Sequence, residues 1–158
     1  MNEERTTNIN LLKKSINLIN QNKIKEAEEI LIGLSKHKDF QVDTFLYLGI
    51  CNIKKNENEK AIEFLKRSLK LNPDHEYANL NLGLVYFSNK NLDISLKYIK
   101  KSLDINNKNQ LAIYHFGLIN LALRKYDEAE KNFLKLLEIN SNDSNALLNL
   151  GIIYNKTN

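Results

Sequence analysis

The sequence predicts an all-α fold in which antiparallel helical hairpins stack into an array, and three observations support this prediction. Four of the five glycines are spaced 34 residues apart, at Gly49, Gly83, Gly117 and Gly151. Apolar residues recur at helical spacing on two stretches within each 34-residue unit. Asn and Asp residues crowd the junctions "NPDHE", "NNKNQ" and "SNDSN", where their side chains can cap helix N-termini.

The composition is that of an ordinary globular protein. The chain has 158 residues, of which 42% are hydrophobic and 27% charged, so it can bury a substantial core. No apolar run approaches membrane-spanning length, and "MNEERTTNIN" lacks the apolar region of a signal peptide. The single cysteine, Cys51, excludes an internal disulfide framework and is predicted to be a small buried hydrophobe. We therefore expect a cytoplasmic location.

The regular glycines require a compensating interaction. A glycine inside a helix costs about 1 kcal/mol relative to alanine. The glycines lie in "YLGICN", "NLGLVY", "HFGLIN" and "NLGIIY", and the first three are followed, after a short polar turn, by a second amphipathic stretch such as "EKAIEFLKRSLKLNPD". Each unit thus contains two helices of about 14 residues. We predict that the glycines allow these two helices to approach closely, and that stacking of units completes the core.

This pattern resembles the tetratricopeptide repeat family, whose 34-residue unit pairs a small residue at position eight with one at position twenty. The corresponding pairs here are Ser15 with Ala27, Gly49 with Ala61, Gly83 with Ser95, and Gly117 with Ala129. Pro73 matches the proline that ends the family's repeat. The resemblance implies a right-handed superhelix of units 8–41, 42–75, 76–109, 110–143 and a partial unit 144–158. Residues 1–7 are predicted to be a flexible N-terminus.

The resemblance implies a non-catalytic scaffold for protein–protein interaction that holds a peptide or helix in an apolar groove. In this family the first helices of the units line a concave groove. At the groove positions we predict a binding site formed by Tyr47, Ile50, Tyr77, Leu80, Asn81, Leu84, Phe87, Tyr114, His115, Leu118 and Asn149. Side-by-side packing of first helices is a simpler explanation for part of this apolar character.

One binding mode of the family is not supported. Carboxylate-clamp members grip the acidic C-terminal peptide of heat-shock chaperones with lysines, an arginine and asparagines. The corresponding positions are Leu46, Ile50, Asn81, Leu111 and His115, and only Asn81 fits. Asn81 and Asn149 resemble the asparagine ladder by which some members hold a peptide backbone, although Tyr47 and His115 interrupt it.

The sequence shows no recognisable catalytic, cofactor or metal motif. His37, His75 and His115 have no partners at metal-ligand spacing, and no glycine-rich phosphate loop is present. We therefore expect neither enzymatic activity nor a cofactor. The net charge of +4 reflects lysines on the second helices, mixed with acidic residues and without interleaved aromatics. A nucleic-acid partner is therefore not expected.

Two questions stay open from sequence. Asn52 and Asn120 should face the core, either in a structural hydrogen bond to the adjacent turn or in a polar, hydrated pocket. Leu150, Ile153 and Tyr154 should form an apolar face without a partner in this chain. A second copy could cover that face, giving a homo-oligomer through the C-terminal half-repeat, and a truncated gene is the alternative. A self-associating fragment or a regulatory subunit of a larger assembly is the alternative function.

Overall fold

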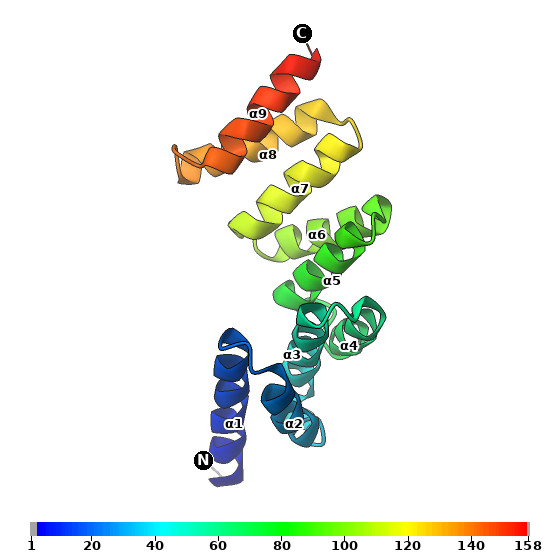
Figure 1. Ribbon diagram of the computed structural model, residues 1–158, viewed down its shortest axis with the longest axis vertical. Coiled ribbons are helices and arrows are strands. Elements are labelled where there is room, and N and C mark those ends of the chain that lie inside the picture. Colours follow the sequence, from blue (N-terminus) through cyan, green and yellow to red (C-terminus); the bar gives the residue numbers. More distant parts are fainter. Residues whose placement is uncertain (1–2, 158) are drawn as a thin grey trace.

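The computed structural model describes residues 3–157, in which α-helices are joined by short turns (Figure 1). Within these residues there are nine α-helices, one 3-10 helix and no strand. The elements are α1 (Glu3–Asn20), α2 (Ile24–Leu34), η1 (Lys38–Phe40), α3 (Gln41–Lys54), α4 (Asn58–Leu71), α5 (Glu76–Ser88), α6 (Leu92–Ile105), α7 (Gln110–Ala122), α8 (Tyr126–Ile139) and α9 (Ser144–Thr157). The predicted all-α fold is confirmed.

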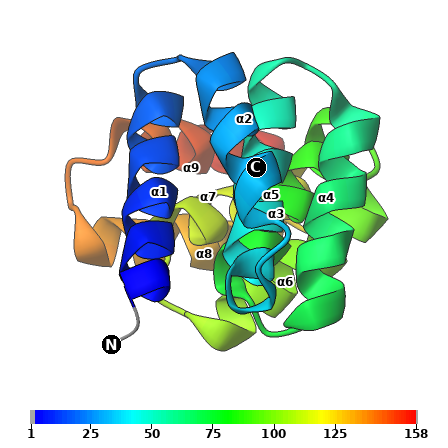
Figure 2. The same ribbon diagram turned by 90° about the horizontal axis from the view of Figure 1, so that it is seen from below.

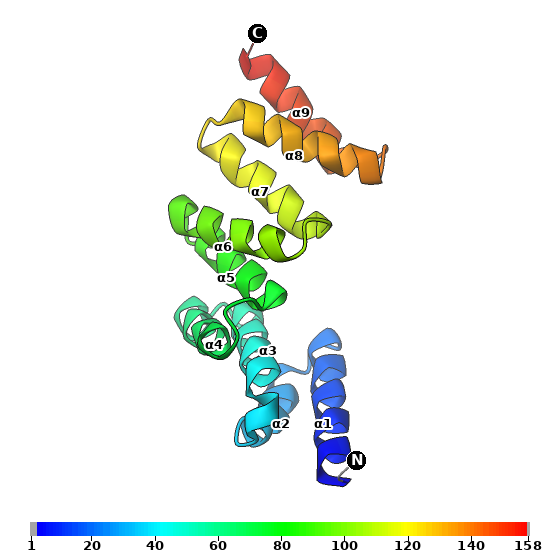
Figure 3. The same ribbon diagram turned by 180° about the vertical axis from the view of Figure 1, so that it is seen from behind.

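The helices pack in sequential order. The hairpins α1–α2, α3–α4, α5–α6 and α7–α8 have the most extensive contacts, and each stacks on the next through α2–α3, α4–α5, α6–α7 and α8–α9. The hairpins follow one another along the long axis, with the two termini at opposite ends (Figures 1 and 3). In a view along that axis, α3, α5 and α7 gather near the centre while α4 and α6 lie towards the periphery (Figure 2). This arrangement is the solenoid that the 34-residue period predicts.

The glycines permit close helix approach, as predicted. A Cβ atom placed on Gly83 would lie 2.7 Å from both Cγ1 and Cδ1 of Ile99 and 3.1 Å from its backbone nitrogen. The two neighbouring hairpins repeat this geometry, since a Cβ added to Gly49 would lie 2.7 Å from Leu65 Cγ, and one added to Gly117 would lie 2.9 Å from the Phe133 ring. The space that each glycine leaves is therefore filled by a large apolar residue sixteen positions later.

The small residues at position twenty lie one helical turn before these bulky residues. Ala61, Ser95 and Ala129 are fully buried. The Ser95 hydroxyl donates a hydrogen bond of 2.8 Å to the carbonyl oxygen of Gly83. The predicted pairing of small residues is thus present for Gly83 with Ser95, and for Gly49 with Ala61, whose carbonyl oxygen would lie 3.5 Å from an added Cβ. The glycines are needed because of the bulky residue one helical turn further along the second helix.

The turn inside each hairpin contains one residue in the left-handed region. These residues are Asn22, Asn56, Lys90 and Arg124, with φ values of 61°, 60°, 59° and 59°. They recur with the same 34-residue period as the glycines. Asparagine tolerates this conformation, whereas a lysine or arginine carries strain of roughly 1 kcal/mol. The sequence pattern did not reveal this feature, because the residue type changes from unit to unit.

The predicted helix caps are present at two of the three junctions. The Asn109 Oδ1 accepts a hydrogen bond from the Ala112 backbone N–H at 3.1 Å, and the Asp143 Oδ1 accepts one from the Ala146 N–H at 2.9 Å. At the start of α5 the cap is His75, whose Nδ1 accepts from the Ala78 N–H at 3.3 Å. The Asn and Asp residues of that junction do not cap α5 themselves.

Residues 3–7 belong to the segment 1–7 that is predicted to be flexible, and its flexibility stays a prediction. They form the first turns of α1, where the Thr7 hydroxyl donates to the Glu3 carbonyl oxygen at 3.0 Å. Glu3 and Glu4 lie in the first turn, where negative charge favours the helix dipole. Residues 1 and 2 lie outside the described part of the chain.

The predicted apolar face of the C-terminal helix is wrong for two of its three residues. Leu150 and Ile153 are buried, in one core cluster with residues of α7 and α8. The reason is rotational, since Ala146, Leu150 and Ile153 follow helical spacing on the side of α9 that packs on α8. The apolar side chains that α9 exposes are Leu147, Leu148, Ile152 and Tyr154. Self-association through α9 stays a prediction, with this redefined surface.

Candidate functional site

Nine of the eleven residues predicted to line a binding groove are at least partly exposed on the first helices. We call these nine residues the inner surface: Tyr47 and Ile50 on α3, Tyr77, Asn81, Leu84 and Phe87 on α5, and Tyr114, His115 and Leu118 on α7. The three helices lie side by side, because α3 contacts α5 and α5 contacts α7. The spacing of three or four residues places each set on one side of its helix.

The other two predicted residues are buried. Leu80 is 3% exposed and packs in one cluster with Ile99 and Ala112, and Asn149 is 7% exposed. Leu80 occupies a position of the repeat that the following first helix covers. Leu148, at the same position of the last helix, is 64% exposed. Because Leu80 and Asn149 offer little surface to a ligand, the inner surface does not include them.

An aromatic cluster lies at the centre of the inner surface. The ring centroids of Phe87 and His115 are 5.5 Å apart at an interplanar angle of 76°, and those of Tyr114 and His115 are 5.4 Å apart at 79°. Both are edge-to-face arrangements, a geometry that stabilises aromatic pairs beyond the effect of burying their surface. The Tyr114 ring also meets Phe133 of α8 at 6.2 Å. The cluster thus joins two adjacent hairpins, and its Tyr114 ring is packed against the core.

His115 contributes a polar atom without a partner to this cluster. Its Nδ1 is shielded from solvent and has no hydrogen-bond partner among residues 3–157. Burial lowers the pKa of His115 below its ordinary value of 6.5. The imidazole is therefore neutral at neutral pH, and the cluster carries no positive charge of its own.

A second polar group lies where α3 meets the start of α5. Because the His75 Nδ1 accepts the capping hydrogen bond, its Nε2 carries the proton and faces Asp43 Oδ1 at 3.3 Å. The pKa of the Tyr47 hydroxyl is raised by burial first, and then by the nearby Asp43 and Tyr77. The sequence did not predict the contact between Asp43 and His75. The sequence feature that could have predicted this contact is the position of both residues at the N-terminal ends of successive first helices.

The asparagines of the first helices are satisfied locally. The Asn81 side-chain amide donates to the Tyr77 carbonyl oxygen at 2.7 Å, so its Oδ1 is the group left for a ligand. Asn52 and Asn120 are buried, as predicted, and donate to carbonyl oxygens four residues earlier, at 2.7 Å and 2.9 Å. Their role is therefore structural, but the hydrogen bond goes to their own helix and not to the adjacent turn.

The described residues offer little for metal or redox chemistry. Over residues 3–157, no group of three or more His, Cys, Asp or Glu side chains is arranged to hold a metal ion. Cys51 is fully buried, and burial, followed by the nearby Glu28, raises the pKa of its thiol to about 12. A thiol in this state is unreactive. No helix in the described part of the chain combines the length and apolarity needed to cross a bilayer.

The stacked hairpins, their 34-residue period and the glycine contacts define a tetratricopeptide-type helical repeat protein. Residues 54–136, just over half of the chain, match the family model described as anaphase-promoting complex, cyclosome, subunit 3. The chain belongs to this tetratricopeptide-like family.

Known proteins share the fold over most of the chain. A tetratricopeptide repeat protein from Parabacteroides merdae ATCC 43184 superposes with a TM-score of 0.80 at 22% identity, covering 94% of this chain and 59% of its own. The first repeat domain of Spaghetti (RPAP3), bound to the HSP90 peptide SRMEEVD, superposes with a TM-score of 0.71 at 20% identity. This match covers 74% of the chain and 93% of that domain.

A curated relative matches a shorter segment. The rhomboid protease GluP of Bacillus subtilis (strain 168) is 29% identical over 76 residues, which is 48% of this chain. The match spans only 15% of the length of GluP. The likeness is therefore confined to a small part of that protein.

Proposed function

We propose that the protein is a non-catalytic scaffold that binds an apolar peptide or a short helix on its inner surface, centred on Phe87, Tyr114 and His115. The observation that carries the proposal is the partly exposed aromatic cluster joining two adjacent hairpins. Binding energy concentrates on central aromatic residues that a partner can desolvate. The free, buried Cys51 suits a reducing compartment, so we place this function in the cytoplasm.

The chemistry of the inner surface favours an apolar anchor over an acidic terminus. Its nine residues include no lysine, arginine or carboxylate, and the neutral His115 adds no charge. Tyr77, at the edge of this surface, is 55% exposed and offers both a ring and a hydroxyl. The Spaghetti domain, which is bound to an HSP90 peptide, supports peptide binding as a use of this fold. A different peptide chemistry is expected here, because the basic clamp residues are absent.

The test begins with affinity capture from a lysate and mass spectrometry to identify the partner, followed by calorimetry with the purified partner. Phe87→Ala should weaken binding by about 2 kcal/mol, roughly thirtyfold in affinity, because it removes a central anchor. Leu134→Ala is the matched control, since it shortens an exposed apolar side chain on the second helix α8. Circular dichroism should show unchanged helix content in both variants. Equal affinities of the two variants would refute the assignment of the inner surface.

Self-association is the second candidate, and the exposed apolar residues of α9 favour it. Leu148 and Ile152 are 64% and 40% exposed on adjacent turns of this helix. A row of this kind is suited to another apolar surface. Light scattering should then give a dimer or larger species without added ligand, and Leu148→Asp combined with Ile152→Asp should give a monomer. A monomeric native protein at high concentration would eliminate this candidate.

A further inference from the structure

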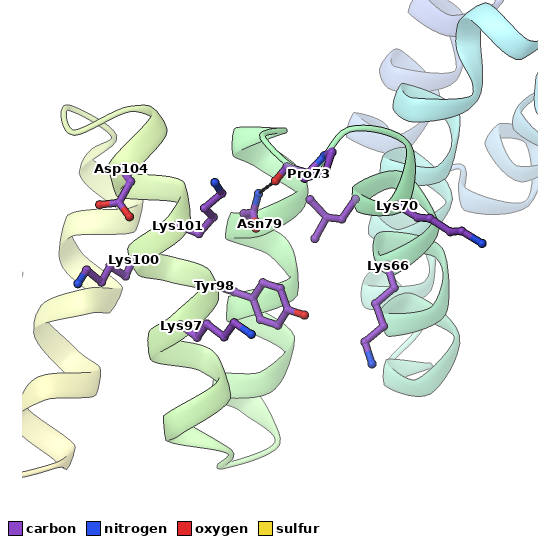
Figure 4. Close-up of a pocket in the computed structure, with 10 residues that line it drawn as sticks. Lys66, Lys70, Pro73, Asn79, Lys97, Tyr98, Lys100, Lys101 and Asp104 are labelled. Atoms are coloured by element: carbon purple, nitrogen blue, oxygen red, sulfur yellow. Dashed lines mark hydrogen bonds between the residues drawn. The ribbon is translucent and has the colours of Figure 1, made fainter.

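A cleft lies on the outer side of the array, between the second helices α4 and α6. Its volume is about 580 Å³, which is within the range of sites for small ligands and single side chains. Leu69 and Tyr98, both half-buried, provide its apolar lining. In Figure 4 the Tyr98 ring extends from α6 into the space towards α4. This cleft is separate from the inner surface, whose residues belong to α3, α5 and α7.

The rim of the cleft is strongly positive. Five lysines and a single aspartate, Asp104, line it. Lys66 and Lys97 extend along the space between the helices, whereas Lys70 and Lys100 point away from it (Figure 4). Lys101 forms an ion pair with Asp74 at one end of the cleft.

The lysines facing the cleft are free to bind an anion. Neither Lys66 nor Lys97 has an ion-pair partner within residues 3–157. Both side chains are exposed. Two unpaired cations on either side of an apolar floor offer a site for carboxylates, because the protein itself does not neutralise them.

The floor of the cleft is held in place. The Tyr98 ring stacks on Tyr86 of α5, with centroids 5.9 Å apart and an interplanar angle of 4°. The Lys66 amine lies 6.0 Å from the Tyr86 ring centroid, at the distance of a cation–π contact. Stacking on Tyr86 fixes the Tyr98 ring, which a ligand would contact, and the Tyr86 ring also positions the Lys66 amine. The site is therefore largely formed before binding.

The next pair of second helices does not repeat the lining of this cleft. One unit later, between α6 and α8, Tyr98 is replaced by Asn132, and Lys70 is replaced by Asp104. The equivalent position therefore lacks the aromatic floor and has an acidic residue in place of a cation. This difference provides an internal control, because Lys131 takes the place of Lys97 there.

We propose that the α4–α6 cleft is a second docking site, for an acidic protein segment carrying one bulky apolar side chain. The apolar side chain lies on Tyr98 and Leu69, and flanking carboxylates contact Lys66 and Lys97. The recessed shape and apolar floor favour such a segment over a flat lipid surface. Asp74 and Asp104 interrupt the positive charge at one end, which disfavours a continuous polyanion such as a nucleic-acid strand. The site is independent of the inner surface, so the protein can hold two partners of opposite chemistry.

The experiment uses the full chain and a defined probe, a short fluorescent peptide of aspartates and glutamates with one central phenylalanine. Binding is followed by anisotropy at ~0.15 M salt, where long-range attraction between exposed charges is screened. Nuclear magnetic resonance then locates the bound probe from the changes in backbone amide chemical shifts. The expected result is saturable binding, with shifts concentrated in α4 and α6 and absent from the inner surface. Replacing the phenylalanine of the probe by alanine should weaken binding about tenfold.

The variants separate a built site from diffuse attraction. Lys66→Gln combined with Lys97→Gln should weaken the probe about fivefold, as expected for two exposed charge contacts. Lys25→Gln combined with Lys131→Gln removes the same charge from other second helices and should change affinity less than about twofold. Phe87→Ala, which tests the inner surface, should leave probe binding unchanged. All four lysines are exposed, so the folds should be retained.

Several results would overturn the proposal. These are the absence of probe binding, amide chemical-shift changes spread over the whole molecule, and equal losses of probe affinity in the two double lysine variants. Equal affinities for the phenylalanine probe and the alanine probe would show that the apolar floor does not contribute to binding. If oligothymidylate bound through Lys66 and Lys97 more tightly than the peptide probe, the cleft would be assigned to a nucleic acid. If phosphatidylcholine vesicles containing phosphatidylserine did so, it would be assigned to a membrane.

Discussion

Gly83→Ala tests whether the regular glycines are required by contact between helices. The change adds one Cβ atom, which would lie 2.7 Å from two side-chain carbons of Ile99 and 3.1 Å from its backbone nitrogen. Ile99 is fully buried, and as a β-branched residue it has few rotamers with which to move aside. Its backbone belongs to α6, so relief of the contact requires a shift of that helix.

The magnitude follows from two opposing effects. Alanine gains about 1 kcal/mol over glycine in a helix interior, whereas overpacking of a filled core costs about 1–3 kcal/mol. Gly151 and Gly33 are helical glycines whose added Cβ would meet no atom within 4 Å, so alanine there should show only the gain. The difference between Gly83→Ala and these controls isolates the contact. We expect it to be about 1–3 kcal/mol in the free energy of unfolding.

Urea unfolding followed by circular dichroism measures these free energies. The double variant Gly83→Ala with Ile99→Ala removes the side-chain atoms that clash, and it should be more stable than the sum of the single changes predicts. A Gly83→Ala protein as stable as Gly151→Ala, with additive effects in the double variant, would show that the glycine spacing has another cause.

Three further predictions concern the pH response, the thiol and the turns. Burial holds the pKa of His115 below 6.5, so the imidazole takes up a proton more readily in the unfolded chain than in the folded one. The free energy of unfolding should therefore fall as the pH drops below about 6.5, and His115→Phe should reduce this pH dependence in urea titrations. Cys51, buried and with its pKa raised to about 12, should react with a disulfide reagent at about pH 8 only after denaturant is added; rapid labelling of the native protein would contradict this. Lys90→Gly should raise the free energy of unfolding by about 0.5–1 kcal/mol through relief of its left-handed φ, and Asn56→Gly should gain less.

The sequence by itself determined the architecture, because that information is periodic and local. A 34-residue recurrence of glycine with two amphipathic stretches specifies hairpins of a fixed size, and Asn109 and Asp143 identify two helix starts. The burial of Asn52 and Asn120 followed from their positions in the repeat, and that of Cys51 from its residue type. The resemblance to the repeat family supplied the eleven candidate binding residues, of which nine lie on a partly exposed side of the first helices; their role in binding stays a prediction.

Only the tertiary structure decided how neighbouring helices cover one another. Leu80 and Leu148 share a repeat position, yet one is buried and the other exposed, because only Leu80 has a following first helix against it. The rotation of α9 buries Leu150 and Ile153, which the sequence pattern had left exposed. The Phe87–His115 contact and the α4–α6 cleft join residues about one repeat apart. Their geometry depends on how the helices cross and where long side chains point, and a sequence period specifies neither.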